Sequence, residues 1–296
     1  MPTIPADEIR QRALATGARL AACDLCPRQC RINRLAGETG FCGIDAMAVV
    51  SSFGPHYGEE RPLVGRGGSG TVFFAGCNLL CLFCQNDDIS HGLAGRAVSD
   101  QELARIFRAV ADDGCHNLNL VTPSHVVPQI LAALALAMDD GFDLPVVFNT
   151  GGYDVPETLQ ALDGVVDIYM PDYKFTDPVV AERLVRAPDY PAVVQDALRE
   201  MYRQVGDLEI ADSGLARRGL LVRHLVMPHG LAGTDAAMKF LAESISRHTY
   251  VNIMGQYHPC HLASEDPELR RRPSPPEMEH AFAVARAAGL WRFDLR

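Results

Sequence analysis

Residues 71–84 read TVFFAGCNLLCLFC, an apolar run that leads through one glycine into three closely spaced cysteines. The run at 71–75 is rich in the β-branched and aromatic side chains that favour a buried strand, and Gly76 ends it. The cysteines follow directly with the spacing C-x3-C-x2-C, at Cys77, Cys81 and Cys84. The stretch therefore predicts a strand that delivers three thiols to the loop at its carboxyl end.

Cysteines are unusually numerous and clustered in this chain. Nine cysteines occur among 296 residues, and seven of the nine fall between positions 23 and 84. Thiols stay reduced in the cytosol and disulfides are rare there, so this clustering in an intracellular protein indicates metal ligands.

Composition and charge exclude several other classes of protein. The chain is 48% hydrophobic and 22% charged, which suits a folded domain with a sizeable core. Its formal net charge is −10, whereas nucleic-acid binding needs a basic surface. The longest apolar run, residues 130–138, is too short to cross a bilayer, and the first residues lack the apolar segment of a secretory signal. We therefore expect a cytoplasmic protein that binds neither nucleic acid nor membrane.

Three thiols form an incomplete ligand set for most metal centres. A structural zinc ion or an electron-transferring cluster takes four protein ligands, so a cluster on three cysteines leaves one iron open for chemistry. The alternative is a zinc site completed by a histidine such as His91. The order of strand, glycine and three-cysteine loop favours the open cluster.

Strand and helix patterns alternate after residue 70. Apolar runs typical of buried parallel strands lie at 71–75, 117–121, 145–149, 166–170, 220–226 and 250–254. Helical patterns lie at 1–22, from the Ser99 cap with Glu102 onward, and at 128–138, 156–162, 179–204, 234–247 and 276–288. Six such units predict an α/β fold with parallel strands, and a partial (β/α)6 barrel is favoured over an open doubly wound sheet.

The chain divides into two parts by composition. Residues 1–68 form a cysteine-rich, metal-binding extension, of which 23–68 is expected to be mostly loop. Residues 69–296 form the barrel domain, with a small hairpin at 205–219.

The extension carries a second cysteine set with the spacing C-x2-C-x3-C-x11-C, at Cys23, Cys26, Cys30 and Cys42. Four thiolates complete the ligand shell of either a zinc ion or an iron–sulfur cluster, and the spacing leaves both open. Arginines interleave with these cysteines and are expected to lower the pKa of the thiols; they are Arg28, Arg31 and Arg34.

The Cys77 loop, with Phe83 before its last cysteine, resembles the signature of the radical S-adenosylmethionine superfamily. The segments CDLCPRQC, VTPSH, FNTGGY, IYMPDYKF, LLVRHLVMP and MGQYHPC are together similar to the pyruvate formate-lyase activating-enzyme-related iron–sulfur proteins. The resemblance implies a [4Fe–4S] cluster whose open iron binds S-adenosylmethionine. Reductive cleavage of that molecule would give methionine and a 5′-deoxyadenosyl radical.

The resemblance and the polar strand ends together predict the residues of the site. Loops at the carboxyl ends of barrel strands build active sites, and the expected cofactor contacts are Phe83, Thr122, Ser124, Asn149, Thr150, Asp172, Lys174 and His224. Residues 122–124, Thr-Pro-Ser, replace the family's Gly-Gly-Glu. Asp172-Tyr173-Lys174 resembles an Asp-Leu-Lys that lies beside the cofactor and a monovalent cation in the activating enzyme, but Asn149 stands where that enzyme has an aspartate.

Two residues near the last strand are expected to be catalytic, namely His258 and Cys260, and for Cys260 an inert thiol at the rim is an equal alternative. For His224, inside an apolar strand beside Arg223, a buried hydrogen-bonding role competes equally with a functional one.

The expected function is a radical enzyme that abstracts hydrogen from a protein or small-molecule substrate. Activation of a glycyl-radical enzyme is one version, which rests on the resemblance alone. Its partners would be that substrate and a one-electron reductant of the flavodoxin or ferredoxin type. The alternative is a non-catalytic protein that uses both cysteine sets as an electron carrier or an interaction module.

Overall fold

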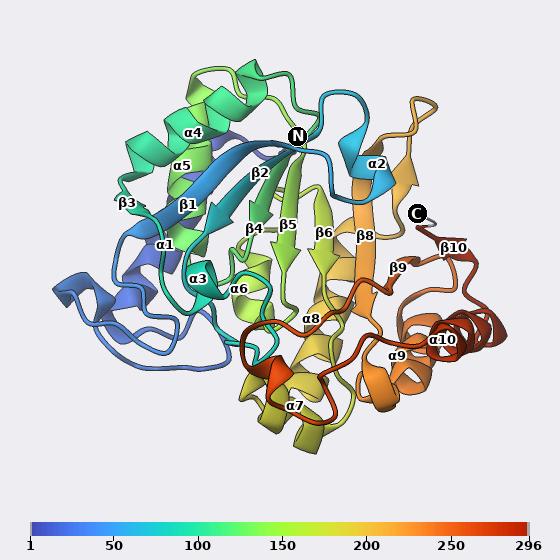
Figure 1. Cartoon of the computed structure of the whole chain (residues 1–296). Helices are drawn as coiled ribbons and strands as arrows, with labels where there is room; N and C mark the ends of the chain where they lie inside the picture. Colours follow the sequence, from blue (N-terminus) through green and yellow to red (C-terminus); the bar gives the residue numbers. More distant parts are fainter. Residues whose placement is uncertain (1, 295–296) are drawn as a thin grey trace.

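The computed structural model describes residues 2–294, and its centre is one mixed β-sheet (Figure 1). Seven neighbouring strands are parallel: β2 (Ser69–Phe74), β4 (Leu118–Val121), β5 (Val146–Thr150), β6 (Ile168–Pro171), β8 (Ala216–Leu225), β9 (Tyr250–Met254) and β10 (Arg292–Phe293). The first six coincide with the six predicted apolar runs, so the prediction of a parallel α/β sheet is confirmed.

Three further strands are antiparallel to their neighbours. β1 (Ala48–His56) pairs with β2, and β3 (Arg96–Val98) pairs with β1 at the edge of the sheet. The prediction that residues 23–68 are mostly loop is therefore wrong for β1, whose partly exposed edge position gives it little of the apolar signal of a buried strand. β7 (Glu209–Ile210) pairs with β8, which confirms the hairpin expected at 205–219.

Two short helices, at 61–64 and 87–90, were not predicted, and the other helices agree with the predicted patterns except in one place. They are α1 (Ala6–Ala18), α2 (Arg61–Val64), α3 (Asp87–Ser90), α4 (Asp100–Asp112), α5 (Val127–Asp139), α6 (Pro156–Gln160), α7 (Pro178–Val185), α8 (Tyr190–Val205), α9 (Thr234–Phe240) and α10 (Pro275–Ala287). The capping box predicted from Ser99 and Glu102 is present at the start of α4. The single helix expected over 179–204 is wrong, because Arg186 takes a left-handed conformation with φ of 55° and Pro188 follows it.

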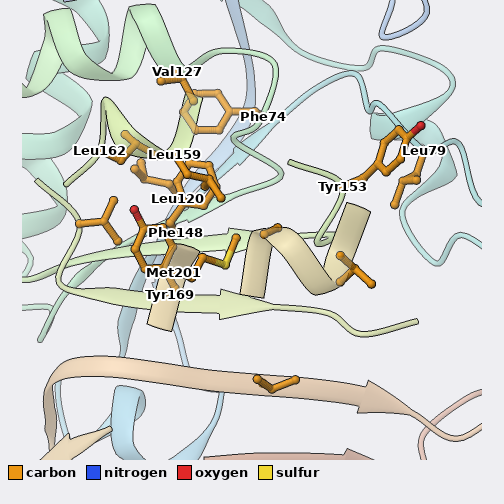
Figure 2. Packing of buried hydrophobic residues seen from close by; sticks show 14 of the residues in the cluster. Phe74, Leu79, Leu120, Val127, Phe148, Tyr153, Leu159, Leu162, Tyr169 and Met201 are labelled. Carbon is orange, nitrogen blue, oxygen red and sulfur yellow. The ribbon is translucent and has the colours of Figure 1, made fainter. Parts of the chain in front are cut away.

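The strands present different surfaces on their two faces. Side chains alternate along a strand, and one set packs with the helices in the main core, as Phe74, Leu120, Phe148 and Tyr169 do (Figure 2). The opposite set is apolar only toward the amino ends of the strands, where Leu63 of α2 packs among Val147, Ile168 and Leu221. Toward the carboxyl ends this second face becomes polar, and three of the predicted site residues lie there: Asn149, Asp172 and Lys174.

The predicted boundary at residue 69 falls inside this packing unit. α1 packs against α5, β1 is hydrogen-bonded to β2, and α2 covers the face of the sheet opposite the helices. The first 68 residues thus supply part of the fold that holds the parallel strands. Among residues 2–294, no helix is long and apolar enough to cross a membrane.

Shortening Leu63 should test how much the amino-terminal segment stabilises the sheet. Leu63 is fully buried, so Leu63→Ala is expected to lower the free energy of unfolding by about 2–5 kcal/mol in urea denaturation, because it leaves a cavity on the sheet. Leu35→Ala, at an exposed leucine, is the matched control and should change stability by under about 0.5 kcal/mol. Equal stabilities of the two variants would contradict this role of α2.

Candidate active site at the carboxyl ends of the strands

The three-cysteine loop begins where β2 ends. Gly76 takes a φ of 81°, and a Cβ there would lie 2.5 Å from the carbonyl oxygen of Cys42, so only glycine fits between strand and loop. The backbone N–H of Leu79 donates to Sγ of Cys77 at 3.4 Å, and Cys84 Sγ lies 3.1 Å from Ser90 Oγ. The loop thus holds its thiols through its own backbone and through α3.

Cys81 of this loop is buried, and Cys77 and Cys84 lie close to it and are partly buried. Burial raises the pKa of Cys77, and it raises the pKa of Cys81 to about 12, although Lys174 acts in the opposite direction on both. Without a metal, the thiols of Cys77 and Cys81 are therefore neutral at pH 7. Metal binding requires their deprotonation and supplies the positive charge that compensates it.

The donor set fits an iron–sulfur cluster better than a single ion. Nowhere in residues 2–294 do three His, Cys, Asp or Glu side chains converge closely enough to hold one metal ion. A tetrahedral zinc ion needs its sulfur ligands about 2.3 Å away, whereas the larger cluster takes each thiolate on a different iron. His91, the candidate fourth zinc ligand, instead hydrogen-bonds Ser90 Oγ at 2.8 Å.

Beside this loop, a charged network joins three of the strands on the polar face. Asp172, just after β6, accepts from Lys174 Nζ at 2.5 Å and from Arg223 Nε of β8 at 2.7 Å. Arg223 also donates through Nη2 to Asn149 Oδ1 of β5 at 2.7 Å. The guanidinium therefore lies between Asn149 and Asp172, the two side chains that the resemblance associates with a monovalent cation.

The network fixes the charges of its members. Burial alone would raise the pKa of Asp172, but Arg223 and Lys174 lower it below its usual value. Burial would likewise lower the pKa of Lys174, but Asp172 raises it. Asp172 is thus a carboxylate and Lys174 an ammonium at neutral pH, held in place at the mouth of the cysteine loop.

The amino-terminal segment contributes a carboxyl group to the same face. Glu60 precedes α2, is 4% exposed, and accepts from Asn252 Nδ2 of β9 at 2.8 Å. Burial raises the pKa of Glu60, and Arg223 acts in the opposite direction. This face therefore carries Glu60 from the extension and Asp172 from the strand ends, and both carboxyl groups interact with Arg223.

The predicted hydroxyl ligands lie in a different, closed network. Thr150 Oγ1 donates to the buried Asp154 at 2.6 Å and lies 3.0 Å from Ser124 Oγ. Both hydroxyls are buried and already hydrogen-bonded within the protein. Thr122, by contrast, is partly exposed and has a φ of 59°, an unusual conformation for a β-branched residue that marks the end of β4 as a strained site.

His224 is a structural residue in this fold. It is fully buried, and its ring nitrogens are hydrogen-bonded to the Tyr173 carbonyl at 2.7 Å and to Thr234 Oγ1 at 2.9 Å. Its side chain belongs to the helix-covered face of β8, opposite to Arg223. Of the two roles open from the sequence, the structure therefore favours the buried hydrogen-bonding one.

The segment after β9 brings the predicted catalytic residues to the cysteine loop. His258 Nδ1 lies 3.4 Å from Nε2 of Gln85, the residue that follows Cys84, and the Leu262 N–H donates to the Leu82 carbonyl at 3.1 Å. Cys260 lies between these two contacts and is partly exposed. Figure 1 shows this segment, in red, passing below the arrowheads of the parallel strands.

The aromatic residue of the cysteine signature has a packing role in the same place. Phe83 is 6% exposed and makes edge-to-face contacts with Phe175 and Tyr257, at centroid distances of 5.9 Å and 6.1 Å. These contacts fix the cysteine loop against the end of β6 and the segment after β9.

The four amino-terminal cysteines line one small cavity. The expectation that neighbouring arginines leave these thiols with a lowered pKa does not hold for Cys26 and Cys42, where burial has the larger effect. Burial raises the pKa of Cys26 to about 12 and also raises that of Cys42, although Arg34 acts to lower the latter. Two of the three arginines are engaged elsewhere: Arg31 pairs with Asp24, and Arg28 donates to the Asn78 carbonyl in the Cys77 loop.

Several residues of the site were not predicted from the sequence. Arg223 had one signal, a cation inside an otherwise apolar strand. Glu60, Asn252 and Asp154 had none, because their importance depends on which strands become neighbours and which face each side chain takes.

Comparisons with known proteins agree with this geometry. The sequence model of the radical SAM superfamily matches residues 71–205, which include the cysteine loop and β2 to β6. The chain belongs to this superfamily, whose members are enzymes, and membership implies a [4Fe–4S] cluster and S-adenosylmethionine.

One relative and one solved structure show how far the likeness extends. The uncharacterized protein MJ0674 of Methanocaldococcus jannaschii is 33% identical over 276 residues, covering 90% of this chain and 75% of its own length. A radical SAM methyltransferase from Sphaerobacter thermophilus shares the fold at a TM-score of 0.52 and 16% identity. That likeness covers 77% of this chain and 66% of the methyltransferase.

The buried state of His224 predicts a dependence of stability on pH. Burial lowers the pKa of His224 to about 4, whereas an unfolded histidine titrates near about 6.5. Between these values the unfolded chain binds the proton and the folded chain does not, so lowering the pH favours unfolding. His224 should cost about 2 kcal/mol of stability between pH 7 and pH 5.

The measurement is urea denaturation at both pH values. The loss of stability between them should be smaller in His224→Gln than in the parent by about the same 2 kcal/mol. His229→Gln, at an exposed histidine, is the matched control and should lose as much as the parent. An unchanged loss in His224→Gln would contradict a neutral, buried His224.

Proposed function

We propose that the chain is a radical enzyme that uses Cys77, Cys81 and Cys84 to hold the cluster at which S-adenosylmethionine is cleaved. The observation that carries the proposal is the three-thiol loop at the end of β2, beside the charged network at the ends of β5, β6 and β8. The bound cluster and S-adenosylmethionine would supply methionine and a 5′-deoxyadenosyl radical for hydrogen abstraction. In this proposal β2, β4, β5, β6, β8 and β9 form the partial (β/α)6 barrel of the superfamily.

The polar strand ends would bind and orient S-adenosylmethionine. Lys174 and Asp172 present an ammonium and a carboxylate of fixed charge, which can pair with the carboxylate and the amino group of the methionyl part. Thr122 offers a partly exposed hydroxyl at the end of β4. Asn149 and Arg223 hold Asp172 in position, while Ser124 and Thr150 support the loops from behind.

His258 and Cys260 are proposed to act on the substrate side. Their segment closes over the cysteine loop through Gln85 and Leu82 and is only partly buried. The substrate is a protein or a small molecule, and a glycyl-radical enzyme is the protein substrate that the resemblance to the activating-enzyme-related branch implies.

An electron donor and a second metal centre complete the proposal. A flavodoxin- or ferredoxin-type protein would donate the electron in the cytoplasm. Cys23, Cys26, Cys30 and Cys42 would form a second metal centre, which is supported by the single cavity that all four thiols line.

Cleavage of S-adenosylmethionine by the reconstituted protein tests the proposal. With iron, sulfide and dithionite under anaerobic conditions, the parent should produce 5′-deoxyadenosine, and Cys81→Ala should lose at least about 100-fold of this activity because a ligand of the cluster is gone. Cys115→Ala, at a buried cysteine outside both sets, is the matched control and should keep it. A parent with a complete cluster that forms no 5′-deoxyadenosine would contradict the radical reaction and favour an electron carrier.

The substrate-side role of Cys260 and His258 makes a separate prediction. Cys260→Ser and His258→Asn should keep the iron content and the slow formation of 5′-deoxyadenosine without substrate, because neither residue holds the cluster in this proposal. Incorporation of deuterium from a labelled substrate into 5′-deoxyadenosine should fall about 10-fold or more if they position it. Loss of iron in either variant would instead make that residue part of the cluster site.

A further inference from the structure

The cavity that the four amino-terminal cysteines line contains two buried polar atoms with unused hydrogen-bonding capacity. Arg34 and His125 also line it, and each is 1% exposed. Within residues 2–294, Nη2 of Arg34 and Nδ1 of His125 have no hydrogen-bond partner. An unpaired buried donor costs roughly 1–3 kcal/mol, and a charged one costs more, so such atoms point to a group that is bound there.

The two atoms differ in chemical character. Arg34 is held by its other nitrogens, with Nε donating to the Asp45 carbonyl and Nη1 to the His125 carbonyl, both at 2.8 Å, and Nη1 lies 3.8 Å from Cys23 Sγ. Its free N–H is a charged donor. His125 Nε2 lies 2.8 Å from the Ala75 carbonyl, which can only accept, so Nε2 carries the proton and Nδ1 presents a lone pair. The free N–H of Arg34 thus suits a bound group with an anionic surface.

The sulfur atoms in this cavity receive hydrogen bonds from backbone N–H groups, as the Cys77 sulfur does. Backbone N–H groups of Arg28, Phe41 and Ile44 donate to the sulfurs of Cys26, Cys30 and Cys42, respectively. Cys77 receives the same kind of bond from Leu79. In neither set do three cysteines of the described chain converge on a point that one metal ion could occupy.

We infer that this cavity holds a second iron–sulfur cluster, ligated by Cys23, Cys26, Cys30 and Cys42, with Arg34 as its buried hydrogen-bond donor. The inference rests on the second metal centre proposed above and names its metal. Four thiolates around a cluster leave net negative charge, which the Arg34 guanidinium offsets inside the protein. Hydrogen bonds to the sulfurs and nearby charge set the reduction potential of such a cluster, so Arg34 raises it.

The segment that lines the cavity is in direct contact with the Cys77 loop. The Cys42 carbonyl packs on Gly76, the residue before Cys77, and Arg28 links the amino-terminal loop to Asn78. The two cysteine-bearing segments therefore touch through their backbones at Cys42 and Gly76. An electron from a ferredoxin- or flavodoxin-type donor would pass through the second cluster to the Cys77 loop. This transfer makes and breaks no bond.

Metal analysis of a variant that lacks the first site tests the identity of the second. The triple substitution Cys77→Ala, Cys81→Ala and Cys84→Ala removes one ligand set, and after anaerobic reconstitution the protein should keep about four iron and four sulfide per chain. Adding Cys26→Ala and Cys42→Ala should remove both. One zinc without sulfide would overturn the inference but leave a second metal centre, whereas absence of any metal would overturn both.

Redox titration of the triple variant with dithionite tests the role of Arg34. The cluster accepts one electron, and Arg34→Met should shift its midpoint potential downward because the compensating charge is lost. Arg34→Lys keeps the positive charge and serves as a second test in case the loop needs that charge to fold. It should shift the midpoint potential less than Arg34→Met does. Arg31→Met, at the exposed arginine paired with Asp24, is the matched control and should leave it unchanged. A potential unaffected by either Arg34 substitution would overturn its assignment as the donor.

Discussion

A parallel sheet has to cover both of its faces, and in this chain the helices that connect the parallel strands cover only one of them. Helices α4 to α10 all supply buried side chains to the main apolar core on that side. The other face is covered near the amino ends of the strands by Leu63 of the short helix α2. The carboxyl half of that face is polar, and its charged groups are joined by ion pairs and hydrogen bonds.

The polar half of this face carries the charged groups of the candidate site. The charged groups Asp172, Lys174 and Arg223 are each less than a fifth exposed, and each of them is paired. Removing one partner of such a pair leaves a buried charge uncompensated, which costs several kcal/mol. The network is therefore a rigid part of the site, and it lies where the cysteine loop emerges from β2.

The extension takes part in the same arrangement. It contributes β1 to the sheet, α2 to the apolar half of the face opposite the helices, and a cysteine-lined cavity. Because the Cys42 carbonyl packs on Gly76 and Arg28 donates to the Asn78 carbonyl, the two cysteine sets are parts of one continuous structure. A fold in which the first 68 residues were merely appended would leave the face opposite the helices open to water.

The sequence alone determined the strand order along the chain, the three-thiol loop and the four-thiol set. These features are local: apolar runs predict strands, and short cysteine spacings predict shared metal sites wherever the chain folds back. Only the tertiary structure decided that Arg223 lies between Asn149 and Asp172, that His224 is buried with both nitrogens hydrogen-bonded, and that Arg34 and His125 line the four-cysteine cavity. The reason is physical. Burial and charge pairing depend on residues distant in sequence, so the pKa of Cys26 rises despite the arginines beside it, and a cation in an apolar strand becomes the centre of the site.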